Sequence, residues 1–187
     1  MPGVPVRPRG RDDGAAPIVL GIDPGIGTTG YAVVRGLSGI GGEGGLDIYR
    51  ALDYGVVTTT VGAPLERRLL ELHERLRTLI REHRPNQVAI EQLFFGRNVT
   101  TAVTVGQARG VALLAFAEAG LPIAEYKPAE IKHTVAGFGR ADKVQMQRMV
   151  QRLLDLEEVP RPDDAADALA IAICHLRYAA ARAAGLR

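Results

Sequence analysis

The order of hydrophobic patterns along the chain limits the folds open to it. Three segments of strand length come first, at residues 18–23 (IVLGID), 31–35 and 49–60. Leucine and isoleucine then recur every three or four residues over 64–83, which predicts an amphipathic helix, and a further strand is predicted over 87–95. Three strands followed by alternating helices and strands predict an α/β domain, in which helices flank a mixed five-stranded sheet.

The second half of the chain supplies the remaining elements of this layout. Gly120 is expected to end the first of its helices, because glycine readily takes the left-handed conformation found just beyond a helix end. The expected elements are a helix over 98–119, a strand over 121–126, helices over 128–137 and 143–156, and a last helix from Asp163 or Asp164 to about Ala183.

Length and composition favour one domain. The chain has 187 residues, of which 47% are hydrophobic and 24% charged, and this is enough to build one core. Residues 1–16 carry charge but no apolar segment, so we expect a disordered tail there rather than a signal peptide. Residues 17–183 are expected to form the domain and 184–187 a short C-terminal tail. The Gly-rich segment 36–45 is expected to be a loop and has no assigned function.

Cysteine and charge give weaker indications. Cys174 is the only cysteine, which excludes an intrachain disulfide and favours a cytoplasmic location. No apolar stretch approaches the roughly 18 to 20 residues of a membrane span, so no membrane partner is expected. The net charge of +2 does not by itself indicate nucleic-acid binding. The only three lysines, however, cluster at Lys127, Lys132 and Lys143, a candidate site for phosphate.

The glycine pattern Gly25-x-Gly27-x-x-Gly30 follows the first strand, as in dinucleotide-binding folds. In those folds the third glycine opens a helix, whereas the strand-forming residues Tyr-Ala-Val-Val follow here. The phosphate-loop pattern GxxxxGK[ST] is absent. The glycines therefore favour a hairpin turn.

Two of the expected strands end in a carboxylate. Asp23 closes IVLGID and Glu91 closes VAIE, where another apolar residue would be expected. Either one alone could cap a turn, but two central strands that both end this way are harder to explain by capping. If the strands are parallel neighbours, the carboxylates converge, and close carboxylates repel each other unless a cation lies between them.

The segment PDDAADALAIAI, residues 162–173, places three aspartates at the start of an apolar helix. At 100° per residue, Asp164 and Asp167 lie about 60° apart and Asp163 and Asp167 about 40° apart, so either pair can share a face. Capping of the helix N-terminus explains Asp163 or Asp164. It does not explain Asp167, a full turn inside the helix, for which a bound divalent ion is the better explanation.

Carboxylates without a histidine or cysteine cluster indicate a hard cation, Mg²⁺ or Mn²⁺. His133 and His175 are not spaced as a ligand pair, and structural roles are expected for them. Two ions roughly 3.5 to 4 Å apart can activate a water and stabilise the leaving oxygen of a phosphodiester. The acidic residues therefore favour two-metal phosphodiester hydrolysis.

Four segments, taken together and in order, resemble the RuvC-type Holliday junction resolvases of the ribonuclease-H-like superfamily. The resemblance implies a ribonuclease-H-like fold, a homodimer, and Mg²⁺-dependent paired nicking of four-way DNA junctions in recombination and repair. It also implies a partnership with a branch-migration motor of the RuvA and RuvB type. The segments, which cover roughly residues 18–176, are IVLGIDPGIGTTGYAVV, AIEQLFFGRNVTTAVTVGQARG, PAEIKHTVAGFGRADKVQMQRMV and DDAADALAIAICH.

The resemblance also implies the catalytic residues, an acidic tetrad made up of Asp23, Glu91, Asp164 and Asp167. Asp163 is thereby left out of the metal ligands and is expected to cap the helix, although its charge leaves the choice between Mg²⁺ and Mn²⁺ open. Asp23 would bridge two metal ions, with Glu91 on one side and the two aspartates on the other. A metal-bound water would attack the phosphate in line and leave a 5′-phosphate and a 3′-hydroxyl.

The same resemblance implies contacts to DNA. Lys132 and Lys143 match basic positions that contact phosphate, and Phe94 matches the aromatic residue that wedges into the junction. Successive side chains of a strand alternate between faces, so Phe94 and Phe95 cannot both point inward, and one is expected to be exposed. Three arginines are further candidates for phosphate contacts: Arg97, Arg109 and Arg140.

Two other functions remain open on the sequence alone. A phosphotransferase of the actin and sugar-kinase class also carries a G-I-D-x-G-x-T loop, but it needs two lobes, and the chain has room for one. A non-catalytic junction-binding dimer is the other, although a pure binder has no use for carboxylates that repel phosphate. For the homodimer of the nuclease, the helix over 98–119 is the candidate contact, because its alanine and valine residues extend beyond one core-facing stripe.

Overall fold

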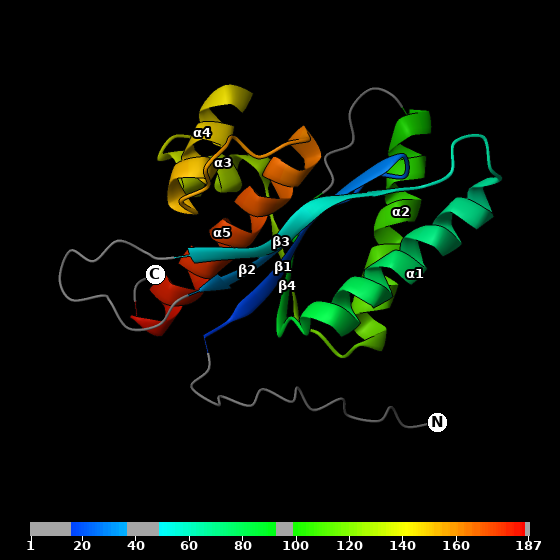
Figure 1. Cartoon of the computed structure of the whole chain (residues 1–187), viewed down its shortest axis with the longest axis horizontal. Coiled ribbons are helices and arrows are strands. Elements are labelled where there is room, and N and C mark those ends of the chain that lie inside the picture. Colours follow the sequence, from blue (N-terminus) through cyan, green and yellow to red (C-terminus); the bar gives the residue numbers. More distant parts are fainter. Residues whose placement is uncertain (1–15, 37–48, 93–98, 186–187) are drawn as a thin grey trace.

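The computed structural model describes residues 16–36, 49–92 and 99–185. Five strands form one sheet, and five helices flank it (Figure 1). The elements in chain order are β1 (Ile18–Asp23), β2 (Thr28–Gly36), β3 (Tyr49–Thr58), α1 (Leu65–His83), β4 (Gln87–Glu91), α2 (Val99–Glu118), β5 (Ile123–Tyr126), α3 (Pro128–Ala136), α4 (Lys143–Leu153) and α5 (Asp163–Ala183).

The sheet has the strand order β3-β2-β1-β4-β5. The pairs β1–β2 and β2–β3 are antiparallel, whereas β1–β4 and β4–β5 are parallel. Helices α1 and α2 cover one face, α5 packs on the other, and α3 and α4 pack against α5 (Figure 1). The predicted α/β class and mixed five-stranded sheet are confirmed.

Several boundaries differ from the sequence prediction. β3 ends at Thr58 rather than at residue 60, and β5 begins at Ile123 rather than at residue 121. The two largest differences, of three residues each, have a local reason. β2 begins at Thr28 rather than at residue 31, because its ladder with β1 extends to the pair Asp23↔Gly30. α4 ends at Leu153 rather than at residue 156, because Asp155 takes a left-handed conformation with φ of 50°.

Several predictions lie outside the described residues. These concern the tail before residue 16, nearly all of the Gly-rich loop, the end of the predicted strand at 93–95, Phe94, Arg97, and the last two residues. Within the described part of the chain, no helix is both long enough and apolar enough to cross a membrane.

Side-chain alternation along the strands turns both predicted carboxylates toward α5. In β1, Val19 packs in the core layer shared with α5, so the period of two places Gly21 and Asp23 on the same face. In β4, Ala89 packs in that layer, which places Glu91 there as well. The edge of the sheet where β1 and β4 end therefore presents two carboxylates to one helix.

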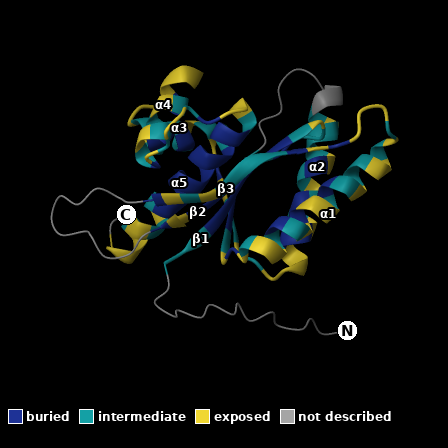
Figure 2. Cartoon of the chain, viewed as in Figure 1, coloured by how far each residue is buried: buried dark blue, intermediate teal, exposed yellow. Residues whose placement is uncertain are grey.

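Helix α5 can approach the sheet closely because it meets glycines there. A Cβ atom at Gly21 would overlap the carbonyl oxygen of Ala168 and lie 2.9 Å from the backbone nitrogen of Ala172. A Cβ atom at Gly30 in β2 would overlap the carbonyl oxygen of Asp164. The helix itself is fully buried over Ala168–Cys174, where it is rich in alanine (Figure 2). Small residues on both sides thus bring the two backbones together.

The buried side chain of His175 ties α5 to the sheet. Its Nδ1 lies 2.8 Å from the Tyr126 hydroxyl, and its Nε2 lies 2.8 Å from Oε1 of Gln87. The amide oxygen can only accept, so Nε2–H donates to Gln87 and Nδ1 accepts from Tyr126. Burial lowers the pKa of His175 to about 4, which keeps the ring neutral. These contacts are structural, as expected for this histidine.

The close approach at Gly21 predicts a large cost for any side chain there. We expect Gly21→Ala to lower the free energy of unfolding by about 2–4 kcal/mol, because the new methyl group meets backbone atoms that cannot rotate away. Urea unfolding would measure this. Gly139→Ala is the control, since a Cβ there would meet nothing nearer than 3.8 Å. Equal stability of the two variants would contradict the packing described.

Candidate active site

Two carboxylates extend from the same edge of the sheet. Asp23 is the last residue of β1, and Glu91 is the last residue of β4. The two strands are parallel neighbours with Ile22 paired to Ile90, so the residues that follow this pair lie side by side. We predicted that Asp23 and Glu91 converge if these two strands are parallel neighbours. The strands are parallel neighbours, and the convergence is confirmed.

The N-terminal turns of α5 bring two further carboxylates to this edge. Asp164 and Asp167 are three residues apart and therefore lie near each other on the helix surface. The backbone of Asp164 touches Gly30, and Gly30 pairs with Asp23 in the β1–β2 ladder. One turn further on, Ala168 contacts β1, so Asp167 is carried to the ends of the strands. Elements far apart in the sequence thus meet at one place.

The electrostatics of this cluster are those of crowded negative charge. Burial raises the pKa of Asp23 to about 7, and the carboxylates of Glu91, Asp167 and Asp164 add to the rise. Burial, followed by repulsion from Asp167, raises the pKa of Glu91. Burial also raises the pKa of Asp167, against the opposing effect of Lys143. The protein alone therefore disfavours full ionisation of the cluster.

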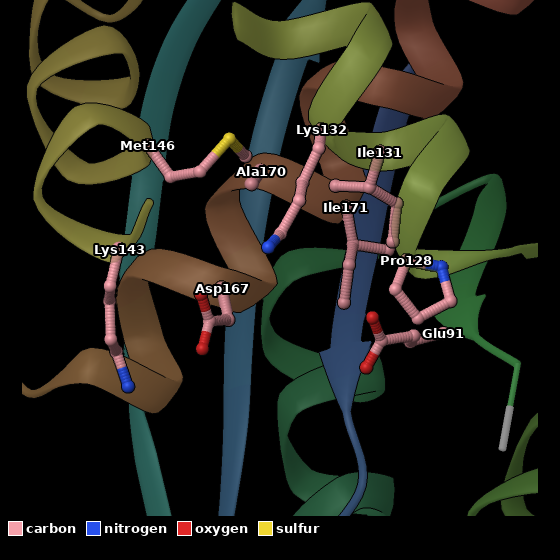
Figure 3. Close-up of a pocket in the computed structure, with 9 residues that line it drawn as sticks. All are labelled: Glu91, Pro128, Ile131, Lys132, Lys143, Met146, Asp167, Ala170 and Ile171. Atoms are coloured by element: carbon pink, nitrogen blue, oxygen red, sulfur yellow. The ribbon is translucent and has the colours of Figure 1, made fainter. Parts of the chain in front are cut away.

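A pocket of about 220 Å³ opens between α3, α4, α5 and the end of β4. Its polar lining consists of Glu91, Asp167, Lys132 and Lys143, and the rest is mainly apolar. Figure 3 shows Lys132 extending from α3 toward the gap between Asp167 and Glu91, whereas Lys143 runs from α4 along the other side of Asp167. Because pockets for drug-sized ligands begin at roughly 300 Å³, this one suits a phosphate group better than a nucleotide.

The lysine cluster divides into two parts. Lys132 and Lys143 line the pocket, so two of the three clustered lysines stand beside the carboxylates. Lys127 instead occupies the exposed N-cap position of α3. The phosphate contacts of Lys132 and Lys143 remain predictions, but both residues lie where such contacts are possible.

Asp163 does not cap α5 by hydrogen bonding, so that part of the sequence interpretation is wrong. Pro162 occupies the N-cap, and no side chain accepts a capping hydrogen bond there. The Asp163 carboxylate instead accepts a hydrogen bond from Nε2 of Gln147 at 2.7 Å and lies 2.9 Å from Nζ of Lys143. A carboxylate in the first turn still suits the helix dipole. The partners belong to another helix, which explains why no local pattern predicted them.

Arg109 contacts the site in a way that the sequence did not predict. One guanidinium nitrogen donates to the main-chain oxygen of Glu91 at 3.2 Å, and another lies 2.7 Å from Oε1 of Glu125. Its side chain is only 12% exposed, so α2 fixes the end of β4 through this residue. Arg140 is exposed in the turn between α3 and α4. Contacts of Arg109 and Arg140 with DNA remain predictions.

The donor set fits a hard divalent cation in type, since all four candidate ligands are carboxylates. Their mutual repulsion and raised pKa values indicate a cluster that lacks positive charge. Within the described ranges, no three acidic, histidine or cysteine side chains are grouped tightly enough to form a complete metal site.

Comparison with known proteins agrees with this geometry. The family model described as crossover junction endodeoxyribonuclease RuvC matches residues 19–175. The crossover junction endodeoxyribonuclease RuvC of Chloroflexus aggregans is 57% identical over 83% of this chain and 90% of the relative.

Solved structures agree as well. The structure of Thermus thermophilus RuvC matches with a TM-score of 0.77 and 40% identity, covering 87% of this chain and 95% of that one. The structure of T. thermophilus RuvC in complex with a Holliday junction substrate also matches with a TM-score of 0.77, at 37% identity and with the same coverage of both chains. The chain therefore belongs to the RuvC family of crossover junction endodeoxyribonucleases.

Proposed function

We propose that this chain is a structure-selective endonuclease that resolves Holliday junctions by paired, symmetric nicks. The observation that carries the proposal is the convergence of Asp23, Glu91 and the two α5 aspartates beside a pocket with two lysines. A T. thermophilus relative that matches 87% of this chain was solved with a Holliday junction substrate. A four-way junction and a symmetric dimer share a two-fold axis, so one active site per protomer gives two matched nicks.

We assign the acidic tetrad as the metal-binding and catalytic group. It would hold two Mg²⁺ or Mn²⁺ ions, because both ions prefer carboxylate oxygens. Bound divalent ions activate a water and stabilise the leaving oxygen of a phosphodiester, which gives a 5′-phosphate and a 3′-hydroxyl. The assignment is supported by the raised pKa values of Asp23, Glu91 and Asp167, which reflect a site that favours added positive charge.

The two pocket lysines are assigned to phosphate binding. Lys132 approaches the gap between Glu91 and Asp167, and Lys143 lies along the outer side of Asp167 (Figure 3). An ammonium group at either position can donate to a phosphate oxygen and offset the repulsion between the carboxylates and DNA. The lysines therefore orient the scissile strand.

We propose that α2 forms the homodimer contact. Its inner side packs against α1 and the sheet, whereas Val103 and Leu114 are 54% and 53% exposed. Gln107 and Gly110 are also exposed, and the spacings of four, three and four residues place all four on one side of the helix. A second copy of the chain is the natural occupant of such a surface, since paired nicking needs two active sites.

The alternative functions gain no support. The actin and sugar-kinase class needs two lobes, whereas the described residues form a single five-stranded sheet with its flanking helices. A non-catalytic binder would not need buried carboxylates that repel one another and DNA. We also propose a branch-migration motor as a partner and a cytoplasmic location. Both proposals follow from the proposed substrate, a DNA junction.

The direct test is incubation of the protein with a labelled synthetic four-way junction and, separately, with linear duplex of the same sequence. We expect paired nicks in the junction with Mg²⁺ or Mn²⁺ and none with EDTA. Equal cutting of both substrates would refute structure selectivity.

Asp167→Asn tests the site itself. We expect cleavage to fall at least about 100-fold, because one ligand charge is lost where phosphate charge must be stabilised. Junction affinity should stay equal or become tighter, since basic residues supply it. Asp155→Asn, in the exposed loop after α4, is the control and should cut normally. Cutting that survives Asp167→Asn would overturn the assignment.

Asp23→Asn tests the repulsion within the tetrad through stability. Burial, aided by neighbouring carboxylates, raises the pKa of Asp23 from 3.8 to about 7. Between pH 3.8 and 7 the folded state therefore holds more protons than the unfolded state. The stability that the folded protein gains from protonation of Asp23 is full below pH 3.8 and is lost as the pH rises through 7. In EDTA at pH 8 we expect the variant to gain on the order of 1–3 kcal/mol over wild type. The gain should shrink at pH 4.

Urea unfolding at the two pH values measures this difference. Mg²⁺ should raise the stability of the wild type more than that of Asp23→Asn, because only the wild type retains all four ligands. The same gain at both pH values, or no gain, would contradict the charge repulsion described.

Leu114→Glu tests the dimer contact. A charge on the exposed α2 surface should convert the dimer to a monomer in sedimentation velocity and abolish paired nicking. Val61→Glu is the control, because Val61 is 93% exposed in the turn between β3 and α1. A Leu114→Glu protein that remains dimeric would place the contact elsewhere.

A further inference from the structure

The carboxylate of Asp163 joins α5 to α4 at the rim of the pocket. One oxygen, Oδ1, accepts a hydrogen bond from Gln147 at 2.7 Å, and the other, Oδ2, lies 2.9 Å from Nζ of Lys143. Gln147 and Lys143 are four residues apart on α4, so they share a face of the helix. Both oxygens of Asp163 are therefore engaged, and the hydrogen bond from Gln147 orients the oxygen that meets Lys143.

This arrangement restrains a side chain that would otherwise be free to move. Lys143 and Asp163 each have a side chain 54% exposed, and a lysine has four rotatable bonds. Without a partner at Asp163, the ammonium group could turn toward Asp167, whose charge it already opposes. An ammonium has three N–H donors, so the contact with Asp163 leaves two for another acceptor.

We propose that Asp163 is a positioning residue that, together with Gln147, holds the ammonium of Lys143 at the pocket rim, ready to bind a phosphate oxygen of the DNA strand to be cut. The inference rests on the proposed function and extends it to a residue outside the acidic tetrad. Asp163 acts on the reaction through Lys143 and does not touch the substrate.

Simple charge repulsion by Asp163 predicts the opposite change in the cutting rate when this residue is removed. As one more carboxylate beside the tetrad, it would repel phosphate, and its removal would then speed cutting or tighten binding. Gln147 separates the two cases, because it orients Asp163 but carries no charge. Under positioning, loss of Gln147 slows cutting, whereas under repulsion it has no effect.

The test measures single-turnover cleavage of a labelled four-way junction by Asp163→Ala and Gln147→Leu. We expect Asp163→Ala to lower the rate about five- to tenfold and Gln147→Leu about two- to fivefold, the size of a weakened charge-assisted contact. The junction dissociation constant in EDTA should change less than about threefold, because other basic residues also contact the backbone. Glu158→Ala is the control: it removes an exposed carboxylate from the loop before α5 and should cut at the wild-type rate.

A double-mutant cycle with Lys143→Met shows whether Asp163 acts through Lys143. In the Lys143→Met background, Asp163→Ala should change the rate less than about twofold, since no ammonium remains to be held. An equal fall in both backgrounds would overturn the positioning role. An Asp163→Ala protein that cuts as fast as the wild type, or faster, would also overturn it.

Folding and function are separable in this design. Exposed ion pairs contribute little to stability, so we expect unfolding midpoints within about 2 °C of the wild type. Should Asp163→Ala unfold more readily, Gln147→Leu, which keeps the carboxylate, decides the question. A wild-type protein that fails to cut junctions contradicts the proposed function, whereas normal cutting by both variants contradicts only the role of Asp163.

Discussion

Repulsion among four carboxylates is the constraint on which the arrangement of this fold depends. Asp23 ends a strand and has a pKa raised to about 7, and the pKa values of Glu91 and Asp167 are raised as well. Bringing these charged carboxylates together therefore opposes folding. The force that holds them together comes from elsewhere in the structure. Helix α5 is buried along most of its length, and His175, two turns beyond Asp167, ties it to the sheet by two hydrogen bonds. Packing in the middle of α5 thus holds the mutually repelling carboxylates of its first turns in place.

Helix α5 also carries Asp167 and supports the helices that carry the two lysines of the pocket. It contacts β1 and β2 through glycines, which fixes its aspartates relative to the sheet. Helices α3 and α4, which carry Lys132 and Lys143, pack on α5. The carboxylates and lysines are therefore positioned by elements that all pack against one helix. The site is built on helices and strands rather than on loops, which holds its side chains more precisely. Arg109 adds a restraint from the other face by holding the main-chain oxygen of Glu91.

The sequence predicted whatever a local pattern or a family motif encodes. Strand-length apolar runs, amphipathic periodicity and helix breakers gave the sheet and the helix order, and the alternation within β1 and β4 put Asp23 and Glu91 on one face once the strands proved to be parallel neighbours. What it missed depends on contacts between distant segments. The bridge from Asp163 to α4 and the clamp of Arg109 on Glu91 join residues that no spacing relates. The start of β2 was missed because pairing with its neighbours extends the strand into a glycine-rich turn.

The balance between carboxylates and lysines explains why only two lysines line the pocket. With the tetrad carboxylates and the Asp163 carboxylate ionised, Lys132 and Lys143 offset two of five negative charges, so the protein alone repels a phosphate backbone. More basic residues at the pocket would remove that repulsion, but they would also pair with the carboxylates and occupy the oxygens that divalent ions need. Neither ammonium group forms an ion pair with a tetrad carboxylate within the described residues, so those oxygens stay open. The deficit of positive charge at the pocket therefore favours the binding of added cations.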